Sequence, residues 1–152
     1  MQNYSFDPDY LRDKYRQERD KRLRDDGNDQ YQEVSGDFSY FVDDPYIDEA
    51  IERQALTDSY EIVIIGGGFG GVLAASRLKE AGFSDFKIIE KGGNFGGTWY
   101  WNRYPGASCD IESYIYFPLL EETKFIPGKK YTNAPETLEY FDVISKKFGL
   151  NE

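Results

Sequence analysis

The sequence runs Glu61-Ile62-Val63-Ile64-Ile65-Gly66-Gly67-Gly68-Phe69-Gly70-Gly71, an apolar, β-branched stretch joined directly to a cluster of glycines. An apolar run of this kind is typical of a strand buried on both faces of a parallel sheet. The residues that follow, Val72 to Ala81, predict a helix ended by Gly82, and Phe86 to Glu90 predicts a second strand. Strand, helix and strand together make one βαβ unit of about 30 residues.

The glycines have the spacing Gly66-x-Gly68-x-x-Gly71. Gly66 allows a tight turn, Gly68 lets the backbone approach a pyrophosphate, and Gly71 lets helix and strand pack closely. The amino terminus of the helix offers unpaired N–H groups and a partial positive charge to the phosphates. A glycine pattern by itself also fits a turn in an unrelated α/β domain, but here strand, glycines, helix and second strand are in register.

Glu90 ends the second predicted strand, 24 residues after Gly66. A carboxylate at that place can accept a hydrogen bond from a ribose hydroxyl. Because it would repel a 2′-phosphate, the sequence predicts a site for FAD or NAD rather than for NADP.

Composition fits a soluble α/β domain with an acidic extension. Of the 152 residues, 39% are apolar and 30% charged, which suffices for one modest core but not for two cofactor domains. Residues 1–59 carry a net charge of −8 and residues 60–152 a net charge of −2. We therefore expect an amino-terminal extension over residues 1–59 and an incomplete nucleotide-binding domain over residues 60–152.

The same counts exclude several classes of function. The net charge of −10 opposes binding to nucleic-acid phosphates or anionic lipid. With no histidine and the single cysteine Cys109, a Cys/His zinc site and an internal disulfide are ruled out. No apolar run is long enough to cross a bilayer, and the start has no apolar signal region, so we expect a cytoplasmic protein.

Other helices are predicted outside the βαβ unit. Asp7-Pro8 is a favourable helix start, and the run to Asp26 contains Glu18–Arg22 and Asp20–Arg24 at i,i+4 spacing, before a stop at Gly27. Five aromatic residues in 28–48 indicate an ordered arm, and a short helix is expected over Ile47 to Leu56. A last amphipathic helix opens at Pro135, is stopped by Gly149, and turns these side chains inward: Leu138, Phe141, Ile144 and Phe148.

A second motif follows the second strand, Gly96-Gly97-Thr98-Trp99-Tyr100-Trp101-Asn102-Arg103-Tyr104-Pro105-Gly106-Ala107-Ser108-Cys109-Asp110. It lies beyond the carboxyl edge of the sheet, where ligands of such folds bind. Its glycines permit close backbone approach, and Trp99 and Trp101 offer flat apolar walls for a ring system. From composition alone, a local mini-core with a solvated Arg103 fits equally well.

The second motif resembles a sequence signature of the type I Baeyer–Villiger monooxygenases, at the positions Gly96, Gly97, Trp99, Tyr104, Pro105, Gly106 and Asp110. The residues after it and the acidic leader also resemble that family, the leader being similar to the extension of members that act on large cyclic or steroidal ketones. The resemblance implies an α/β fold, a partial Rossmann-like (doubly wound, three-layer) FAD-binding domain. It also implies an enzyme that uses FAD, NADPH and O₂ to convert a ketone to an ester or lactone.

The resemblance implies roles for particular residues. Asp110 is the candidate catalytic residue, near the flavin and the nicotinamide, where it would position an arginine that this chain lacks. Ser108 and Cys109 would lie on the side that faces NADP, and Cys109 reads as a small buried residue rather than a nucleophile. The expected cofactor-binding residues are Gly66, Gly68, Phe69, Gly70, Gly71, Glu90, Gly97, Thr98, Trp99, Tyr100, Trp101, Ser108, Cys109, Asp110 and Tyr116.

Parts of the family pattern are missing. Its other signature contains a histidine, and this chain has none; the second glycine motif, for NADP, is missing too. We therefore expect a catalytically incomplete piece of a flavin monooxygenase, with three or so strands, whose partner is the remainder of the enzyme. Two alternatives stay open: a fragment of a flavin-containing or N-hydroxylating monooxygenase, and a non-catalytic flavin- or partner-binding remnant.

Overall fold

The computed structural model describes residues 6–49 and 52–151, which fall into two compact units with the division between Asp43 and Asp44. The boundary predicted from charge, between residues 59 and 60, stays a prediction. Among the described residues, no helix has both the length and the apolar character needed to cross a membrane.

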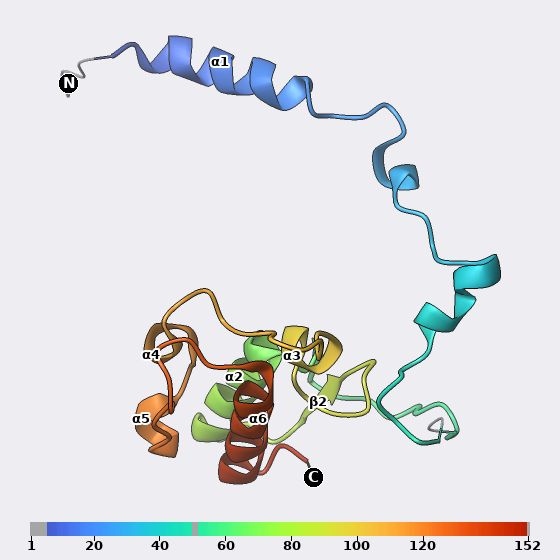
Figure 1. Cartoon of the computed structure of the whole chain (residues 1–152), viewed down its shortest axis with the longest axis vertical. Coiled ribbons are helices and arrows are strands. Elements are labelled where there is room, and N and C mark those ends of the chain that lie inside the picture. Colours follow the sequence, from blue (N-terminus) through green and yellow to red (C-terminus); the bar gives the residue numbers. More distant parts are fainter. Residues whose placement is uncertain (1–5, 50–51, 152) are drawn as a thin grey trace. The chain divides into compact units, whose positions relative to one another are not determined.

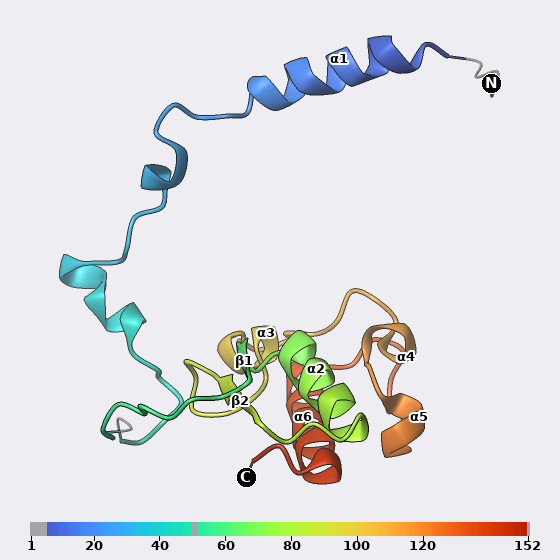
Figure 2. The same ribbon diagram turned by 180° about the vertical axis from the view of Figure 1, so that it is seen from behind.

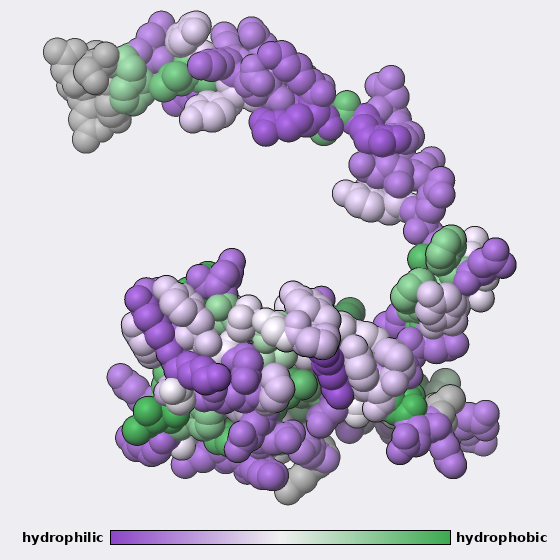
Figure 3. Space-filling model, viewed as in Figure 1, coloured by the Kyte–Doolittle hydropathy of each residue, from purple (hydrophilic) through white to green (hydrophobic). Residues whose placement is uncertain are grey.

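The first unit consists of exposed helical segments. The helix α1 covers Pro8–Asp20, and two 3₁₀ turns follow, η1 at Gly27–Gln30 and η2 at Gly36–Val42. The Asp7 side chain accepts hydrogen bonds from the N–H groups of Asp9 and Tyr10, which confirms the predicted helix start. The helix surface is mostly hydrophilic (Figure 3) and none of its residues is buried.

The predicted extent of the first helix is wrong, because α1 ends at Asp20 and not at Asp26. Arg22 and Arg24 lie past its end, so the expected i,i+4 ion pairs do not form. Glu18 pairs with Lys21 instead, and Arg24 pairs with Asp26. With no buried face to stabilise further turns, local pairs of this kind decide where such a helix stops.

The predicted short helix over Ile47 to Leu56 is also wrong for the residues that are described, 47–49 and 52–56, none of which is helical. Ala50 and Ile51 of that prediction lie outside the described residues. Residues 52–59 are exposed, so a helix there would have no surface on which to pack an apolar face.

The second unit contains the predicted βαβ arrangement (Figures 1 and 2). Strands β1 (Ile62–Ile65) and β2 (Phe86–Ile89) pair in parallel, with Ile62 opposite Phe86 and Ile65 opposite Ile89. The helix α2 (Phe69–Glu80) connects them and starts three residues before the predicted Val72, so that Gly70 and Gly71 lie within its first turn. This confirms the Rossmann-like α/β class for the part of the domain that the chain contains.

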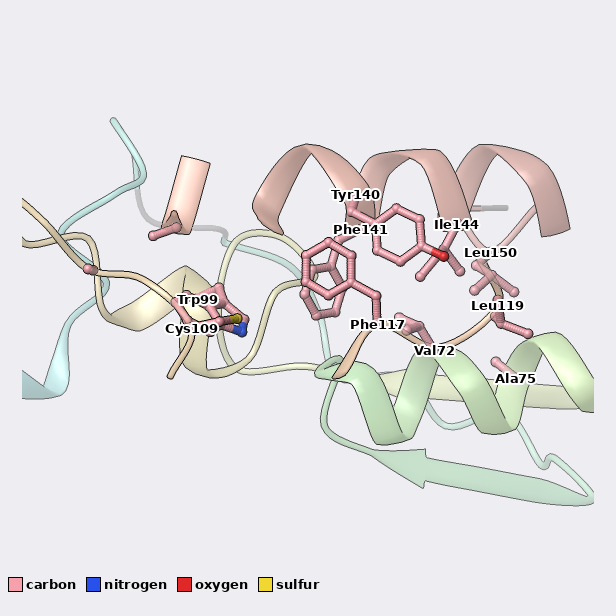
Figure 4. Packing of buried hydrophobic residues seen from close by; sticks show 12 residues of the cluster. Val72, Ala75, Trp99, Cys109, Phe117, Leu119, Tyr140, Phe141, Ile144 and Leu150 are labelled. Carbon is pink, nitrogen blue, oxygen red and sulfur yellow. The ribbon is translucent and has the colours of Figure 1, made fainter. Parts of the chain in front are cut away.

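The core lies between α2 and the long helix α6 (Ala134–Phe148). Asn133 caps α6 by accepting from the N–H of Glu136, Pro135 lies in its first turn, and Gly149 ends it in the left-handed conformation, as predicted. Three short helices lie between β2 and α6: α3 at Thr98–Trp101, α4 at Ser113–Tyr116 and α5 at Leu120–Thr123. Figure 4 shows the side chains that fill the core between the two long helices, among them Val72, Ala75, Phe117, Leu119, Tyr140 and Ile144.

In the described residues, helices cover only one face of the sheet. Ile62 and Ile64 are half-buried, whereas Val63 and Ile65 on the opposite face are 54% and 88% exposed. The prediction of strands buried on both faces is therefore wrong for the described residues, and so is the expected count of three or so strands, since they contain two. The β-branched run is the sequence of a fully covered strand, but residues 6–49 and 52–151 supply helices to one face alone.

This one-sided burial makes the two faces of β1 differ in their response to mutation. We expect Ile65→Thr to change the free energy of unfolding by less than about 0.5 kcal/mol, since the side chain is already in solvent. Ile64→Thr, which removes the same atoms from the core-facing side, should cost about 1–2 kcal/mol. Urea denaturation of the two variants gives this comparison, and equal losses would contradict the described orientation of the strand.

Close packing at the start of α2 gives a second prediction. A Cβ atom on Gly71 would lie 1.9 Å from the carbonyl oxygen of Gly66, whereas one on Gly70 would meet nothing within 4 Å. Gly71→Ala should therefore destabilise the chain by about 2–3 kcal/mol or prevent its folding. Gly70→Ala is the matched control and should be neutral or stabilising by up to about 1 kcal/mol, because alanine favours helix. Thermal unfolding followed by circular dichroism measures both.

Candidate functional site

The glycine turn joins the end of β1 to the start of α2. Gly66 has φ +99°, a conformation that favours glycine, and its N–H donates to the carbonyl of Ile89 at 2.7 Å. Gly68 is the residue that caps α2, but it has no side chain to satisfy the first N–H groups of the helix. Those donors point out of the helix end and suit an anionic ligand.

Glu90 follows β2 and holds the glycine turn from the side. One carboxylate oxygen accepts from the N–H of Gly67 at 2.5 Å, and the other accepts from the N–H of Gly92 at 2.8 Å. The predicted acid thus lies beside the turn, joined to it by a charge-assisted hydrogen bond. Each oxygen has a further lone pair, so a ribose hydroxyl can still bind here.

The two glycine motifs meet through their backbones. The N–H of Gly96 donates to the carbonyl of Gly67 at 3.0 Å. A Cβ on Gly97 would lie 2.8 Å from the Cα of Gly68, and Gly97 has φ +51°. Glycine is therefore required at position 97 both by space and by conformation, and this contact fixes the start of α3 next to the glycine turn.

A pocket of about 400 Å³ opens beside α3. Trp99, only 8% exposed, forms part of its wall, and its indole N–H donates to the Tyr116 hydroxyl at 3.2 Å. The structure brings six of the predicted site residues to this pocket, which are Thr98, Trp99, Ser108, Cys109, Asp110 and Tyr116. Asn102, Tyr104, Ala107 and Ile111 complete the lining.

The loop that carries Cys109 and Asp110 is fixed by the chain leading into α6. Ser108 forms an antiparallel bridge with Asn133, and the N–H of Cys109 donates to the carbonyl of Thr132 at 2.8 Å. Thr132 is fully buried and is bonded in turn to the Ser113 hydroxyl at 3.0 Å. Asp110 itself is exposed at the pocket.

Burial governs the state of Cys109. Its desolvation raises the pKa of the thiol, as does the nearby Asp110, and hydrogen bonding with Thr132 and Thr137 offsets only part of this effect. The side chain is therefore a neutral thiol at neutral pH, in agreement with its interpretation as a small buried residue.

Three of the predicted residues point elsewhere. The Phe69 ring stacks on Phe141 in the core, at 4.3 Å between ring centroids, so only its backbone faces the turn. Trp101 does not line the pocket of Trp99 and lies with its ring 5.8 Å from the Lys91 ammonium. Tyr100 is buried and donates its hydroxyl hydrogen to Asp44 at 2.5 Å.

The sequence interpretation missed Asp44 and Tyr46, which contact residues next to the site without lining it. Asp44 contacts Gly93 and Tyr100, and the Tyr46 ring lies 4.1 Å from the Arg103 guanidinium. Arg103 is thus not merely solvated, as the alternative interpretation had it. Asp44 lies 49 and 56 residues from its partners, so no local spacing could have revealed it.

The chemistry of the donors fits a dinucleotide. The site combines backbone N–H groups at a helix start, an approach free of side chains at Gly68, an acid beside the turn, and an aromatic wall at Trp99. By contrast, no three His, Cys, Asp or Glu side chains within residues 6–49 and 52–151 are grouped so as to hold a metal ion.

Comparison with known families and proteins shows which proteins this chain is similar to. Residues 64–126 match the family model described as an NAD(P)-binding Rossmann-like domain. A Baeyer-Villiger monooxygenase of Stachybotrys chlorohalonatus is 46% identical over 150 residues, which are 98% of this chain and 24% of that protein. The chain thus spans about a quarter of the length of the curated relatives it matches.

Solved structures of monooxygenases are also similar to this chain. A polycyclic ketone monooxygenase from Thermothelomyces thermophila is similar at a TM-score of 0.73 and 42% sequence identity. The match covers 93% of this chain and 24% of that enzyme's chain. OTEMO in complex with FAD and NADP is similar at a TM-score of 0.55 and 34% sequence identity. This match covers 60% of this chain and 18% of the OTEMO chain.

The buried thiol yields a prediction for chemical reactivity. Because burial raises the pKa of Cys109 and hides its sulfur, alkylation by iodoacetamide at pH 8 should be at least about tenfold slower in the native chain than in urea. Mass spectrometry of the labelled chain over time gives the two rates. Similar rates in both conditions would contradict the described burial of the Cys109 loop.

Proposed function

Because the chain corresponds to the amino-terminal segment of the type I Baeyer–Villiger monooxygenases, we propose that it is the part of such an enzyme that binds FAD. The whole enzyme would use NADPH and O₂ to convert a ketone to an ester or lactone. The relatives are about four times as long, so most of the NADP site and the ketone pocket would belong to sequence that this chain does not contain.

One observation carries the proposal, the backbone contact between the glycine turn and the tryptophan motif. It links Gly68, at the phosphate-binding end of α2, to Gly97, at the start of the helix that carries Trp99. A ligand that is held by its diphosphate at the turn can therefore extend its ring system along this wall. In a dinucleotide such as FAD the diphosphate lies in the middle of the molecule, so a ring system on one side of it can reach this wall.

The residues of the chain would divide the binding between them. The N–H groups at the start of α2 would hold the diphosphate, and Glu90 would accept from the adenosine ribose. Trp99 and Tyr116 would exclude water from one side of the flavin, while Asp110 would hold a cation supplied by the rest of the enzyme. FAD, when bound, supplies the redox and oxygen chemistry of the reaction.

Gly68→Ala tests this assignment without disturbing the fold. The backbone at Gly68 has φ −76°, which alanine adopts freely, and the added Cβ would lie in ordinary contact, 3.5 Å from the Cα of Gly97. The methyl group would nevertheless obstruct the approach of a pyrophosphate. We expect the dissociation constant for FAD to rise at least about tenfold at an unchanged unfolding temperature, measured by quenching of flavin fluorescence.

Ala74→Ser, at an exposed position of the same helix, is the control and should bind FAD like the unaltered chain. Absence of FAD binding by the unaltered, folded chain would contradict the proposal. For the enzyme that contains this segment, the expected product from a cyclic ketone is a lactone. Oxidation of an amine without lactone formation would favour an N-hydroxylating enzyme instead.

A further inference from the structure

Asp44 lies where the chain first joins the second unit, ahead of β1. One of its carboxylate oxygens accepts from the N–H of Tyr46 at 2.9 Å, across Pro45. This local turn orients the carboxylate. Its second oxygen is therefore presented to the rest of the unit in a fixed direction.

That second oxygen joins two segments of the candidate site. It accepts from the Tyr100 hydroxyl of α3 at 2.5 Å and from the N–H of Gly93, in the loop after β2, at 2.8 Å. The same N–H also lies 3.0 Å from the Tyr100 hydroxyl oxygen. A single carboxylate oxygen thus ties together the arm before β1, the loop after β2 and the tryptophan helix.

Arg103 closes this arrangement from the other side. Its guanidinium lies over the rings of Tyr46 and Tyr100, at 4.1 and 4.4 Å from their centroids, and its Nε donates to the Tyr100 carbonyl at 2.9 Å. Stacking of this kind is favourable for a cation on aromatic faces. Partial burial works against the charge of Asp44, but the hydrogen bonds from Tyr100, Tyr46 and Gly93 and the attraction of Arg103 prevail and lower its pKa.

Two positions of the loop after β2, Gly92 and Gly93, have room only for glycine. A Cβ on Gly92 would lie 2.8 Å from the Tyr100 ring, and one on Gly93 would lie 2.3 Å from the side chain of Ile47. Gly92 also donates to Glu90, the acid that holds the glycine turn. The contacts of Asp44 therefore continue, through Gly92 and Glu90, to the phosphate-binding turn.

We infer that Asp44 is a positioning residue for the cofactor site, which fixes the loop after β2 and the tryptophan helix α3 against the glycine turn before the cofactor arrives. Asp44 touches neither the turn nor the pocket of Trp99, so it would act through Tyr100 and Gly93. This role rests on the proposed function, since the site that it orders is the proposed FAD site. It would also assign a function to residues 44–46 of the predicted amino-terminal extension.

The test compares Asp44→Asn with Asp43→Asn in the full chain. Both remove one negative charge, but only the first replaces one of two accepting oxygens by an NH₂ group, so that the contacts with Tyr46 on one oxygen and with Tyr100 and Gly93 on the other cannot all be kept. We expect Asp44→Asn to raise the dissociation constant for FAD about tenfold and to speed hydrogen exchange at the Gly93 amide, without FAD, by at least about tenfold. Asp43→Asn should change neither quantity. Exchange is followed by mass spectrometry of peptides that cover the loop.

Tyr100→Phe keeps the ring and removes only the hydroxyl, and it carries the same test if Asp44→Asn does not fold. The double variant should weaken FAD binding no more than Asp44→Asn alone, because the Tyr100 hydroxyl would act only through its contacts with Asp44 and Gly93. Unchanged FAD affinity in Asp44→Asn, or effects that multiply in the double variant, would overturn the inference. A folded, unaltered chain without affinity for FAD would contradict the proposed function itself, and the exchange at Gly93 would then still report whether Asp44 orders the loop.

Discussion

The site depends on one close approach between two pieces of backbone. Gly68 and Gly97 lie so near each other that a single added carbon on Gly97 would come within 2.8 Å of its neighbour. The hydrogen bond from Gly96 to the carbonyl of Gly67 holds the two segments at this separation. Since the first segment ends the strand β1 and the second begins the helix α3, this contact converts two local motifs into one surface. Side chains could not replace it, because any side chain at position 97 would force the segments apart.

Each side of this contact is supported by a different part of the chain. Phe69 stacks on Phe141 and so ties the start of α2 to α6. The segment that leads into α6 in turn holds the Cys109 loop through the carbonyl of Thr132, whose buried hydroxyl is bonded to that of Ser113. On the opposite side, Asp44 and Arg103 enclose Tyr100. The core is therefore also the support that fixes the walls of the site.

How much of this could be predicted from the sequence depends on the distance between interacting residues along the chain. The glycine turn, Glu90 and the capped helix α6 follow from spacings within one motif, and the structure has them where they were predicted. The end of α1 was misplaced because no buried face stabilises further turns of that helix, so weak local pairs decide its length. Asp44 was missed because its partners are 49 and 56 residues away and its own neighbourhood is an ordinary turn.

The strand β1 shows a different limit. Its apolar residues predicted burial on both faces, yet Ile65 is exposed in the described structure. The residues of a strand suit the environment in which the strand functions. The structure described here contains only the part of that environment that this chain supplies. An unbroken Ile-Val-Ile-Ile run has no advantage on a sheet that faces water, where alternating polar residues would serve better. The mismatch therefore agrees with the fourfold greater length of the relatives: the β-branched run fits a sheet that is covered on its second face as well.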